Sequence, residues 1–177
     1  DEATHKKTAA SIESTLAEYG VEGNVTEIRP GPTVTLYGIR PGWTRKYKEV
    51  RSKSASGQTV TTKEEIGKVR VKVDKIAALD KDLALQLKAP SIRIDAPIPG
   101  TNLVGIEVPN KIADTVYLQT QLLSKKFSQI VKTDELPFSL GKGSGGDVQT
   151  ADITKMPHLL VAGATGSGKS VFVNSLI

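Results

Sequence analysis

The stretch from residue 159 to residue 170 restricts what this chain can fold into more than any other part of the sequence. Four apolar residues, 159–162, lead into a glycine-rich loop that ends in Gly168, Lys169 and Ser170. The spacing is that of G-x-x-x-x-G-K-[ST], a loop that cradles the phosphates of a nucleoside triphosphate. The apolar residues before the loop predict a strand, and those after Ser170 predict a helix. The sequence therefore predicts a strand–loop–helix unit with a phosphate site.

Each residue type in this loop has an expected task. We expect Gly163 to leave the strand with a positive φ, which a side chain would make costly. Gly166 and Gly168 keep side chains out of the space for the phosphates, so that successive N–H groups form an anion-binding nest. Lys169 is expected to contact the β- and γ-phosphates of ATP, and the Ser170 hydroxyl to bind Mg²⁺. The complete set of predicted ATP- and phosphate-binding residues is Gly163, Thr165, Gly166, Ser167, Gly168, Lys169, Ser170 and Val171.

The position of the loop matters as much as its pattern, because the sequence stops at Ile177, seven residues after Ser170. It does not include a later apolar strand ending in Asp or Glu, which would hold Mg²⁺ through water and polarise the attacking water. A parallel sheet also needs several β-α-β units. We therefore expect this chain, which has no complete catalytic set, to be inactive in ATP hydrolysis by itself, whereas the protein that contains it is expected to be an ATPase.

Composition sets further bounds. The 177 residues suffice for one domain or two small ones, and a hydrophobic content of 38% supports a core. The absence of Cys excludes disulfides and thiolate chemistry, and His5 and His158 are too far apart in the sequence to favour a metal site. No apolar run approaches the roughly 18 residues of a membrane span, and Asp1-Glu2 does not begin a signal peptide. We expect a cytoplasmic location, and the formal net charge of +5 suits a nucleic-acid partner.

Hydrophobic periodicity, punctuated by Gly and Pro, predicts a succession of helices and strands. Helices are expected at 8–19, 74–87 and 119–124, the second with Asp74 as its N-cap. The buried stripe of that second helix is predicted to be Ile76, Leu79, Leu83 and Leu87. Strands are expected at 25–29, 33–39, 68–73, 92–94, 103–108 and 159–162, with a hairpin of 137–140 and 148–153. In the strand 68–73, Val69, Val71 and Val73 alternate with cations and predict one buried face.

The segment from residue 43 to residue 67 is polar and basic. Arg45, Lys46, Lys48 and Arg51 are candidate contacts to DNA phosphates, since Lys and Arg release counterions when they bind DNA. The simpler interpretation is a solvated loop or a solvent-facing hairpin extension whose charges maintain solubility. Both interpretations stay open at the level of sequence.

Several blocks of the sequence together resemble one family. The lead-in and loop at 155–170, with Met156-Pro157-His158 before the strand, closely resemble the Walker A segment of the FtsK/SpoIIIE double-stranded DNA translocases. Residues 97–100 and 104–110 resemble the Ile-Pro-Gly and Gly-Ile-Glu-Ile-Pro-Asn blocks of that family, 115–118 its next strand, and 75–84 its middle helix. Ala164 replaces a Thr of the family pattern, and the basic segment near 43–70 is longer than the family's usual link.

The resemblance implies two domains and a fold class. It implies an α/β protein in which residues 8–110 form the α domain, with a basic insertion near 43–70. Residues 111–177 would then form the N-terminal part of a RecA-like β motor domain, truncated after Walker A. The whole motor would be a hexameric ring that uses ATP and Mg²⁺ to move double-stranded DNA in chromosome partition and cell division. A parent anchored to the inner face of the cell membrane belongs to the same expectation, although no membrane segment lies in this chain.

Two other classes of function stay open. A P-loop ATPase of secretion or conjugation shares the loop, but we do not expect it to share the blocks at 97–100 and 104–110. The chain itself can also be described as a non-catalytic module for ring assembly and for lining a DNA channel.

Overall fold

The structure is a computed structural model that describes residues 2–53 and 59–176. Helices and strands are mixed along the chain, which confirms the predicted α/β class. The first helix, α1 (Glu2–Glu18), begins earlier than its periodicity predicts and ends close to the predicted stop at Gly20.

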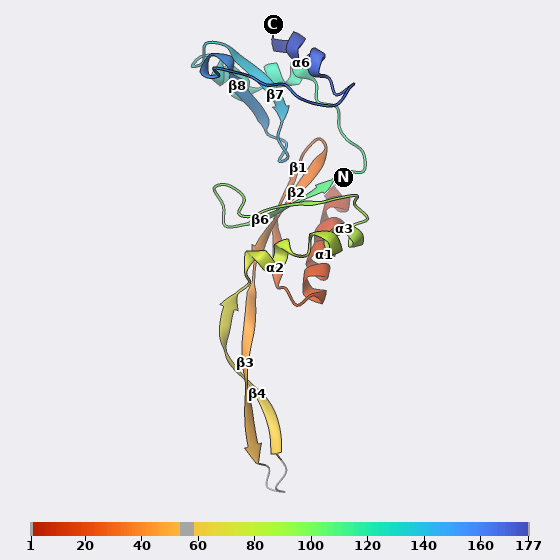
Figure 1. Ribbon diagram of the computed structural model, residues 1–177, viewed down its shortest axis with the longest axis vertical. Coiled ribbons are helices and arrows are strands. Elements are labelled where there is room, and N and C mark those ends of the chain that lie inside the picture. The colour runs from red at the N-terminus through yellow and green to blue at the C-terminus, as the bar shows by residue number, and fades with distance from the viewer. Residues whose placement is uncertain (1, 54–58, 177) are drawn as a thin grey trace.

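Four strands form an antiparallel sheet in the N-terminal part of the molecule (Figure 1). They are β1 (Gly23–Pro30), β2 (Val34–Pro41), β5 (Arg93–Asp95) and β6 (Val104–Pro109), which occur in the spatial order β1-β2-β6-β5. A tight turn joins β1 to β2, where the Gly31 N–H donates to the Val34 carbonyl oxygen at 2.9 Å. All four strands lie where the hydrophobic pattern predicts them, within a residue or two.

The core lies between one face of this sheet and three helices, which are α1, α2 (Val73–Ala77) and α3 (Asp80–Gln86). Alternation places Tyr37 and Ile39 of β2 on this face, and Leu36 on the opposite face, as a period of two requires. The fully buried aliphatic side chains of the core are Ile12, Leu16, Ile39, Ile76, Leu83, Val104 and Ile106. Leu36 packs instead with Ile98 and Leu103 from the loop before β6.

The predicted helix over 74–87 is two short helices, so the continuous helix was wrong. The break falls at Leu79, which has φ −94° and ψ 15°. The predicted stripe survives the break, because Ile76, Leu79 and Leu83 are all buried and Leu87 packs against them partly buried. The predicted N-cap is also wrong: Lys72 holds that position without a side-chain hydrogen bond. Asp74 lies in the first turn of α2, where its negative charge interacts favourably with the helix dipole and stabilises the helix.

The basic segment forms a long antiparallel ribbon of β3 (Trp43–Lys53) and β4 (Thr59–Arg70). Of the two structures predicted for this segment, the hairpin extension is therefore confirmed and the irregular loop is wrong. The half-buried strand predicted over 68–73 is largely wrong. Val69 and Val73 are 41% and 38% exposed, and only Val71 is buried. The reason is positional, because Val71 lies where the ribbon meets the body and its N–H donates to the Gly42 carbonyl oxygen.

The C-terminal part contains a two-stranded sheet and four short helical segments. These are α4 (Leu118–Leu122), α5 (Lys125–Ile130), β7 (Pro137–Lys142), β8 (Val148–Asp152), the 3-10 helix η1 (Ile153–Lys155) and α6 (Lys169–Leu176). The predicted hairpin and the predicted helix near 119–124 are both present. The strand expected at 115–118 is not formed, because these residues are irregular up to the start of α4. In the described ranges, no helix combines the length and the apolar character that crossing a bilayer requires.

Asn110 ties the end of β6 to the turn between β1 and β2. Its side-chain Nδ2 donates to the Gly31 carbonyl oxygen at 2.8 Å, and its Oδ1 accepts from the Thr35 hydroxyl at 2.7 Å. Gly31 must lack a side chain here, because a Cβ would collide with the carbonyl oxygen of Ser144 in the turn between β7 and β8. Two segments that are far apart in sequence therefore meet at the junction near residue 110, whereas the domain division at 8–110 and 111–177 stays a prediction.

Candidate phosphate-binding loop

The glycine-rich loop leads directly into α6, as its pattern predicts. Gly166 and Gly168 have φ values of +81° and +88°, which L side chains rarely adopt. A Cβ placed at either residue would meet no atom within 4 Å, so the space beside both is open. The first hydrogen bond of the helix runs from the Phe172 N–H to the Gly168 carbonyl oxygen at 2.8 Å. The loop therefore has the curvature, the free space and the helix N-terminus that an anion-binding nest requires.

Gly163 contributes to the loop in a different way from the one expected. It is not among the residues with positive φ, so the predicted conformational role is wrong. Instead, a Cβ at this position would collide with the hydroxyl oxygen of Ser167 across the loop. The requirement for glycine at this position is steric.

Lys169 closes the loop on itself. Its Nζ donates to the carbonyl oxygens of Gly163 and Ala164, each at 2.8 Å. The Ser167 N–H adds a third link, to the Ala164 carbonyl oxygen at 3.2 Å. A bound phosphate would offer the ammonium a charged acceptor in exchange for two neutral ones, and hydrogen bonds to charged groups are roughly twice as strong. The two carbonyl partners of Lys169 were not anticipated from the sequence.

The other predicted residues of the loop are at its surface. Thr165, Ser170 and Val171 are exposed, and among the described residues the Ser170 hydroxyl makes no hydrogen bond. An exposed hydroxyl at the first turn of a helix suits a Mg²⁺ ion that is held mainly by phosphate oxygens and water. In the described part of the chain, no three His, Asp or Glu side chains gather into a metal site. The exposed Ser170 hydroxyl is the donor of the loop that would suit a Mg²⁺ ion bound together with a nucleotide.

The apolar residues before the loop do not form the predicted strand. Residues 158–164 are irregular, and Leu159 and Leu160 are 40% and 90% exposed. A strand exists only when its N–H and C=O groups pair with a neighbour, and no strand within 2–53 or 59–176 pairs with this segment. The apolar residues 159–162 have the composition of a strand, but they form one only if a neighbouring strand pairs with their N–H and C=O groups.

Helix α6 is attached to the hairpin of β7 and β8 by an aromatic contact. The rings of Phe138 and Phe172 meet edge to face, with centroids 6.0 Å apart and planes at 66°. Phe138 is buried at 7% exposure. This geometry is the favourable one for aromatic pairs and fixes the start of α6 against β7.

A network of hydrogen bonds around Asp152 orders the approach to the loop. Asp152 Oδ1 accepts from the Thr154 hydroxyl at 2.6 Å and from the Thr154 N–H at 3.0 Å, and the Leu136 N–H lies at 3.4 Å. Lys155 Nζ bridges Asp134 at 2.5 Å and Asp152 at 3.5 Å. The Thr154 hydroxyl bond above all, with the two N–H groups and the Lys155 ammonium, lowers the pKa of Asp152 from 3.8 to about 2.

This shift predicts a local loss of structure in acid. A carboxyl whose folded pKa is below its unfolded value stabilises the fold above pH 3.8, and that contribution is lost as the pH falls from 3.8 towards about 2. We expect hydrogen-exchange protection of the Leu136 and Thr154 amides to fall over this range. In Asp152→Asn the step should be absent, with weaker protection at pH 7. A step of equal size in both proteins would contradict the assignment.

The candidate DNA contacts lie far from the loop. Arg45, Lys46 and Lys48 are exposed on the ribbon, and the side chain of Arg51 falls outside the described residues. Figure 1 shows the ribbon and α6 at opposite ends of the molecule, so the structure does not bring these two predicted sites together. Lys68 and Arg70 on the facing strand are also exposed.

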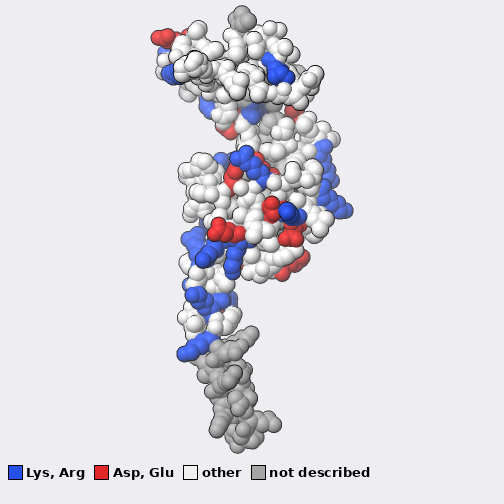
Figure 2. All heavy atoms as spheres, in the orientation of Figure 1, with Lys and Arg blue, Asp and Glu red and all other residues white. Residues whose placement is uncertain are grey.

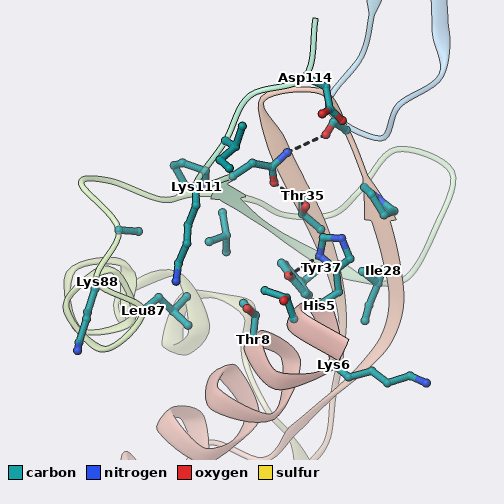
Figure 3. A pocket seen from close by; sticks show the side chains of 18 of the residues that line it. His5, Lys6, Thr8, Ile28, Thr35, Tyr37, Leu87, Lys88, Lys111 and Asp114 are labelled. Atoms are coloured by element: carbon teal, nitrogen blue, oxygen red, sulfur yellow. Dashed lines mark hydrogen bonds between the residues drawn. The ribbon is translucent and has the colours of Figure 1, made fainter. Parts of the chain in front are cut away.

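A recess of about 1160 Å³ lies on the N-terminal part, between the start of α1, the sheet and residues 87–90 (Figure 3). At its floor, His5 Nδ1 and the Tyr37 hydroxyl oxygen are 3.4 Å apart, and burial raises the pKa of Tyr37 above its ordinary value. Residues of the glycine-rich loop do not line it. The recess is therefore separate from the predicted phosphate site.

Fold and loop together define a class, an α/β protein whose glycine-rich loop carries the sequence pattern of nucleotide-binding loops. The chain matches the FtsK alpha domain family over residues 1–110 and the FtsK/SpoIIIE family over residues 117–177. It belongs to the FtsK/SpoIIIE family, as its blocks of sequence predict.

Curated relatives agree with this assignment. Proteins named DNA translocase FtsK from Caldanaerobacter subterraneus subsp. tengcongensis and from Clostridium tetani are each 43% identical over 169 residues, which is 96% of this chain. One of the same name from Caulobacter vibrioides is 41% identical over 180 residues and covers 100% of the chain. The matches cover 20%, 19% and 18% of those three relatives, so the chain spans about a fifth of their length.

Proposed function

We propose that this chain is the α domain and the first part of the motor domain of an ATP-driven double-stranded DNA translocase. The observation that carries the proposal is the match to this family over both parts of the chain, on relatives named DNA translocase. The match over residues 1–110 favours a translocase over the secretion and conjugation ATPases, because they are not expected to share this part. Chromosome partition and cell division follow as the process, and the cytoplasmic side of the membrane as the location.

The nucleotide enters this proposal through the loop. The N–H groups around Gly166 and Gly168, at the N-terminus of α6, are the proposed cradle for the phosphates of ATP. Lys169 would exchange its two carbonyl partners for phosphate oxygens, and Ser170 would hold Mg²⁺, which supplies charge neutralisation at the phosphates. Hydrolysis and assembly into a hexameric ring are proposed for the complete motor, and this chain by itself is proposed to be inactive.

The test compares this chain with a protein that continues through the remaining length of the relatives. The longer protein is expected to hydrolyse ATP faster when long duplex DNA is added, and to displace a third strand bound to that duplex in an ATP-dependent reaction. The 177-residue chain should show neither activity. The proposal would be overturned if duplex DNA did not change the rate of ATP hydrolysis by the longer protein. It would also be overturned if the 177-residue chain hydrolysed ATP in a Mg²⁺-dependent reaction.

A further inference from the structure

The ribbon of β3 and β4 stands apart from the rest of the fold. Its two strands contact each other along their whole length, and within the described residues no other element packs extensively against either of them. Figure 1 shows it projecting away from the sheet and the three helices. At about 3.3 Å per residue, the 11 residues of β3 span roughly 36 Å. An arm of this length contributes little to the core, and its described side chains, at 43–48 and 65–70, are exposed on both faces except for the half-buried Thr44.

The ribbon also accounts for the charge of the whole chain. Residues 43–70 contain eight Lys and Arg against three Glu, a net charge of +5. The full sequence has 24 basic and 19 acidic residues, so the remaining residues hold 16 of each sign and are neutral overall. Lys and Arg side chains are seen along the described part of the arm in Figure 2. The basic character is therefore a property of the ribbon alone.

Cations occupy both faces of the ribbon. Cross-strand pairing places Arg45 opposite Lys68 on the same face as Trp43 and Arg70, because directly paired residues share a face. Lys46 and Lys48 alternate to the other face. An acid offsets part of the first face, since Glu65 lies 3.5 Å from Arg45. Lys46, Lys48 and Lys68 are exposed, and among the described side chains no acidic group lies within ion-pairing distance of them. Lys48 lies opposite Glu64 in the register, and the side chain of Glu64 falls outside the described residues.

The face of the ribbon that carries Arg45 also has exposed aromatic side chains, one of them where the ribbon joins the rest of the fold. The Arg70 guanidinium lies over the Trp43 ring, 5.6 Å from its centroid, and Trp43 itself is 49% exposed. Tyr47, farther along the same strand, is 53% exposed. A bulge between Lys46 and Tyr47 increases the local twist of the arm. The arm is thus a twisted, two-faced cationic ribbon.

This distribution of charge selects the partner. A flat anionic surface, such as a membrane, would meet only one face of a ribbon and leave the other face solvated. The major groove of duplex DNA is about 12 Å wide, admits a two-stranded ribbon and surrounds it with phosphates on both sides. Backbone contacts of this kind carry no sequence information. Duplex DNA therefore uses the cations of both faces, which neither a membrane nor a single flat acidic patch does.

We propose that the ribbon of β3 and β4 is an arm that holds duplex DNA by its phosphates, independently of base sequence and of nucleotide. The proposal rests on the function proposed above for the class of partner, but not on the phosphate loop, which lies at the other end of the molecule. Lys46 and Lys48 on one face and Lys68 on the other are the residues that it requires. In a motor, such an arm would retain the duplex while the nucleotide site is empty.

The first test measures binding of the 177-residue chain to a 30-base-pair duplex, without ATP, over a series of salt concentrations. The Lys46→Gln/Lys48→Gln variant should lower the slope of log K against log salt by about 2, and binding at 0.1 M salt by roughly sixtyfold. Lys111→Gln/Lys125→Gln is the matched control, because it removes the same charge from exposed sites outside the ribbon. An equal loss in both variants would overturn the proposal, since it would mean diffuse attraction rather than an arm.

A second measurement locates the contact and separates the possible partners. The chain has no Cys, so Lys46→Cys and Lys125→Cys each provide a single attachment point for a photo-crosslinker. Crosslinks to duplex DNA from position 46 and not from position 125 are expected. Binding to vesicles that contain anionic lipid but not to duplex DNA would replace the proposal with a membrane arm. Nucleotide binding is scored separately in the longer protein, so either the arm or the motor can fail while the other stands.

Discussion

Replacing Lys169 by alanine is expected to lower ATP hydrolysis by about 10²–10³ in a protein that extends this chain through the length of its relatives. Lys169 holds its ammonium inside the glycine-rich loop through the carbonyl oxygens of Gly163 and Ala164. A phosphate bound at the N-terminus of α6 would lie beside that charge. Loss of one preorganised donor of this kind costs two to three orders of magnitude in rate.

Two controls make this result specific to the loop. Lys142→Ala removes an exposed cation from the end of β7, in the same part of the chain, and should leave hydrolysis within about twofold of the wild type. Circular dichroism should show α6 retained in Lys169→Ala, because the Phe138–Phe172 contact that anchors it is untouched. Unchanged hydrolysis in Lys169→Ala would remove this loop from the nucleotide site.

Ile106→Ala is expected to lower the free energy of unfolding by about 2–5 kcal/mol, because it leaves a cavity in the centre of the core. Ile106 is completely buried on β6, between Tyr37 of β2 and Ile94 of β5. The helices α1 and α3 close over it, with Ile12, Leu16 and Leu83 in the same cluster. Urea unfolding of the chain measures the loss directly.

Leu85→Ala is the matched comparison, because Leu85 is an aliphatic residue with 80% of its surface exposed on α3. Its truncation should change the free energy of unfolding by no more than about 0.5 kcal/mol. The dependence on urea should keep its slope in both variants if only native stability has changed. Equal effects of Ile106→Ala and Leu85→Ala would mean that the sheet and helices do not enclose this core.

Local pattern was sufficient for much of the fold. The strands β2, β5 and β6 follow from alternating apolar residues between Gly and Pro turns, and the stripe of Ile76, Leu79 and Leu83 follows from helical spacing. The pattern failed where burial depended on distant partners. Val69 and Val73 have the alternation of a half-buried strand, but they are 41% and 38% exposed, because Val69 lies on the projecting ribbon and Val73 begins α2.

The candidate site divides in the same way. The glycine-rich loop and its candidate phosphate-binding residues come from the pattern at 163–170, since the spacing itself encodes where N–H groups, Lys and Ser can lie. The steric reason for Gly163, the carbonyl partners of Lys169 and the Asp152 network depend on atoms brought close by the folded chain. No one-dimensional pattern marks these contacts, because their partners are set by loop geometry rather than by spacing.

The sequence by itself determined the family, the α/β class and the position of the glycine-rich loop, because these depend on short-range order of residue types. Only the tertiary structure decided that β3 and β4 form a projecting arm with cations on two faces, and that residues 159–162 remain unpaired among the described strands. Strand pairing is a relation between distant segments. Its outcome therefore depends on which partners the fold brings within hydrogen-bonding distance.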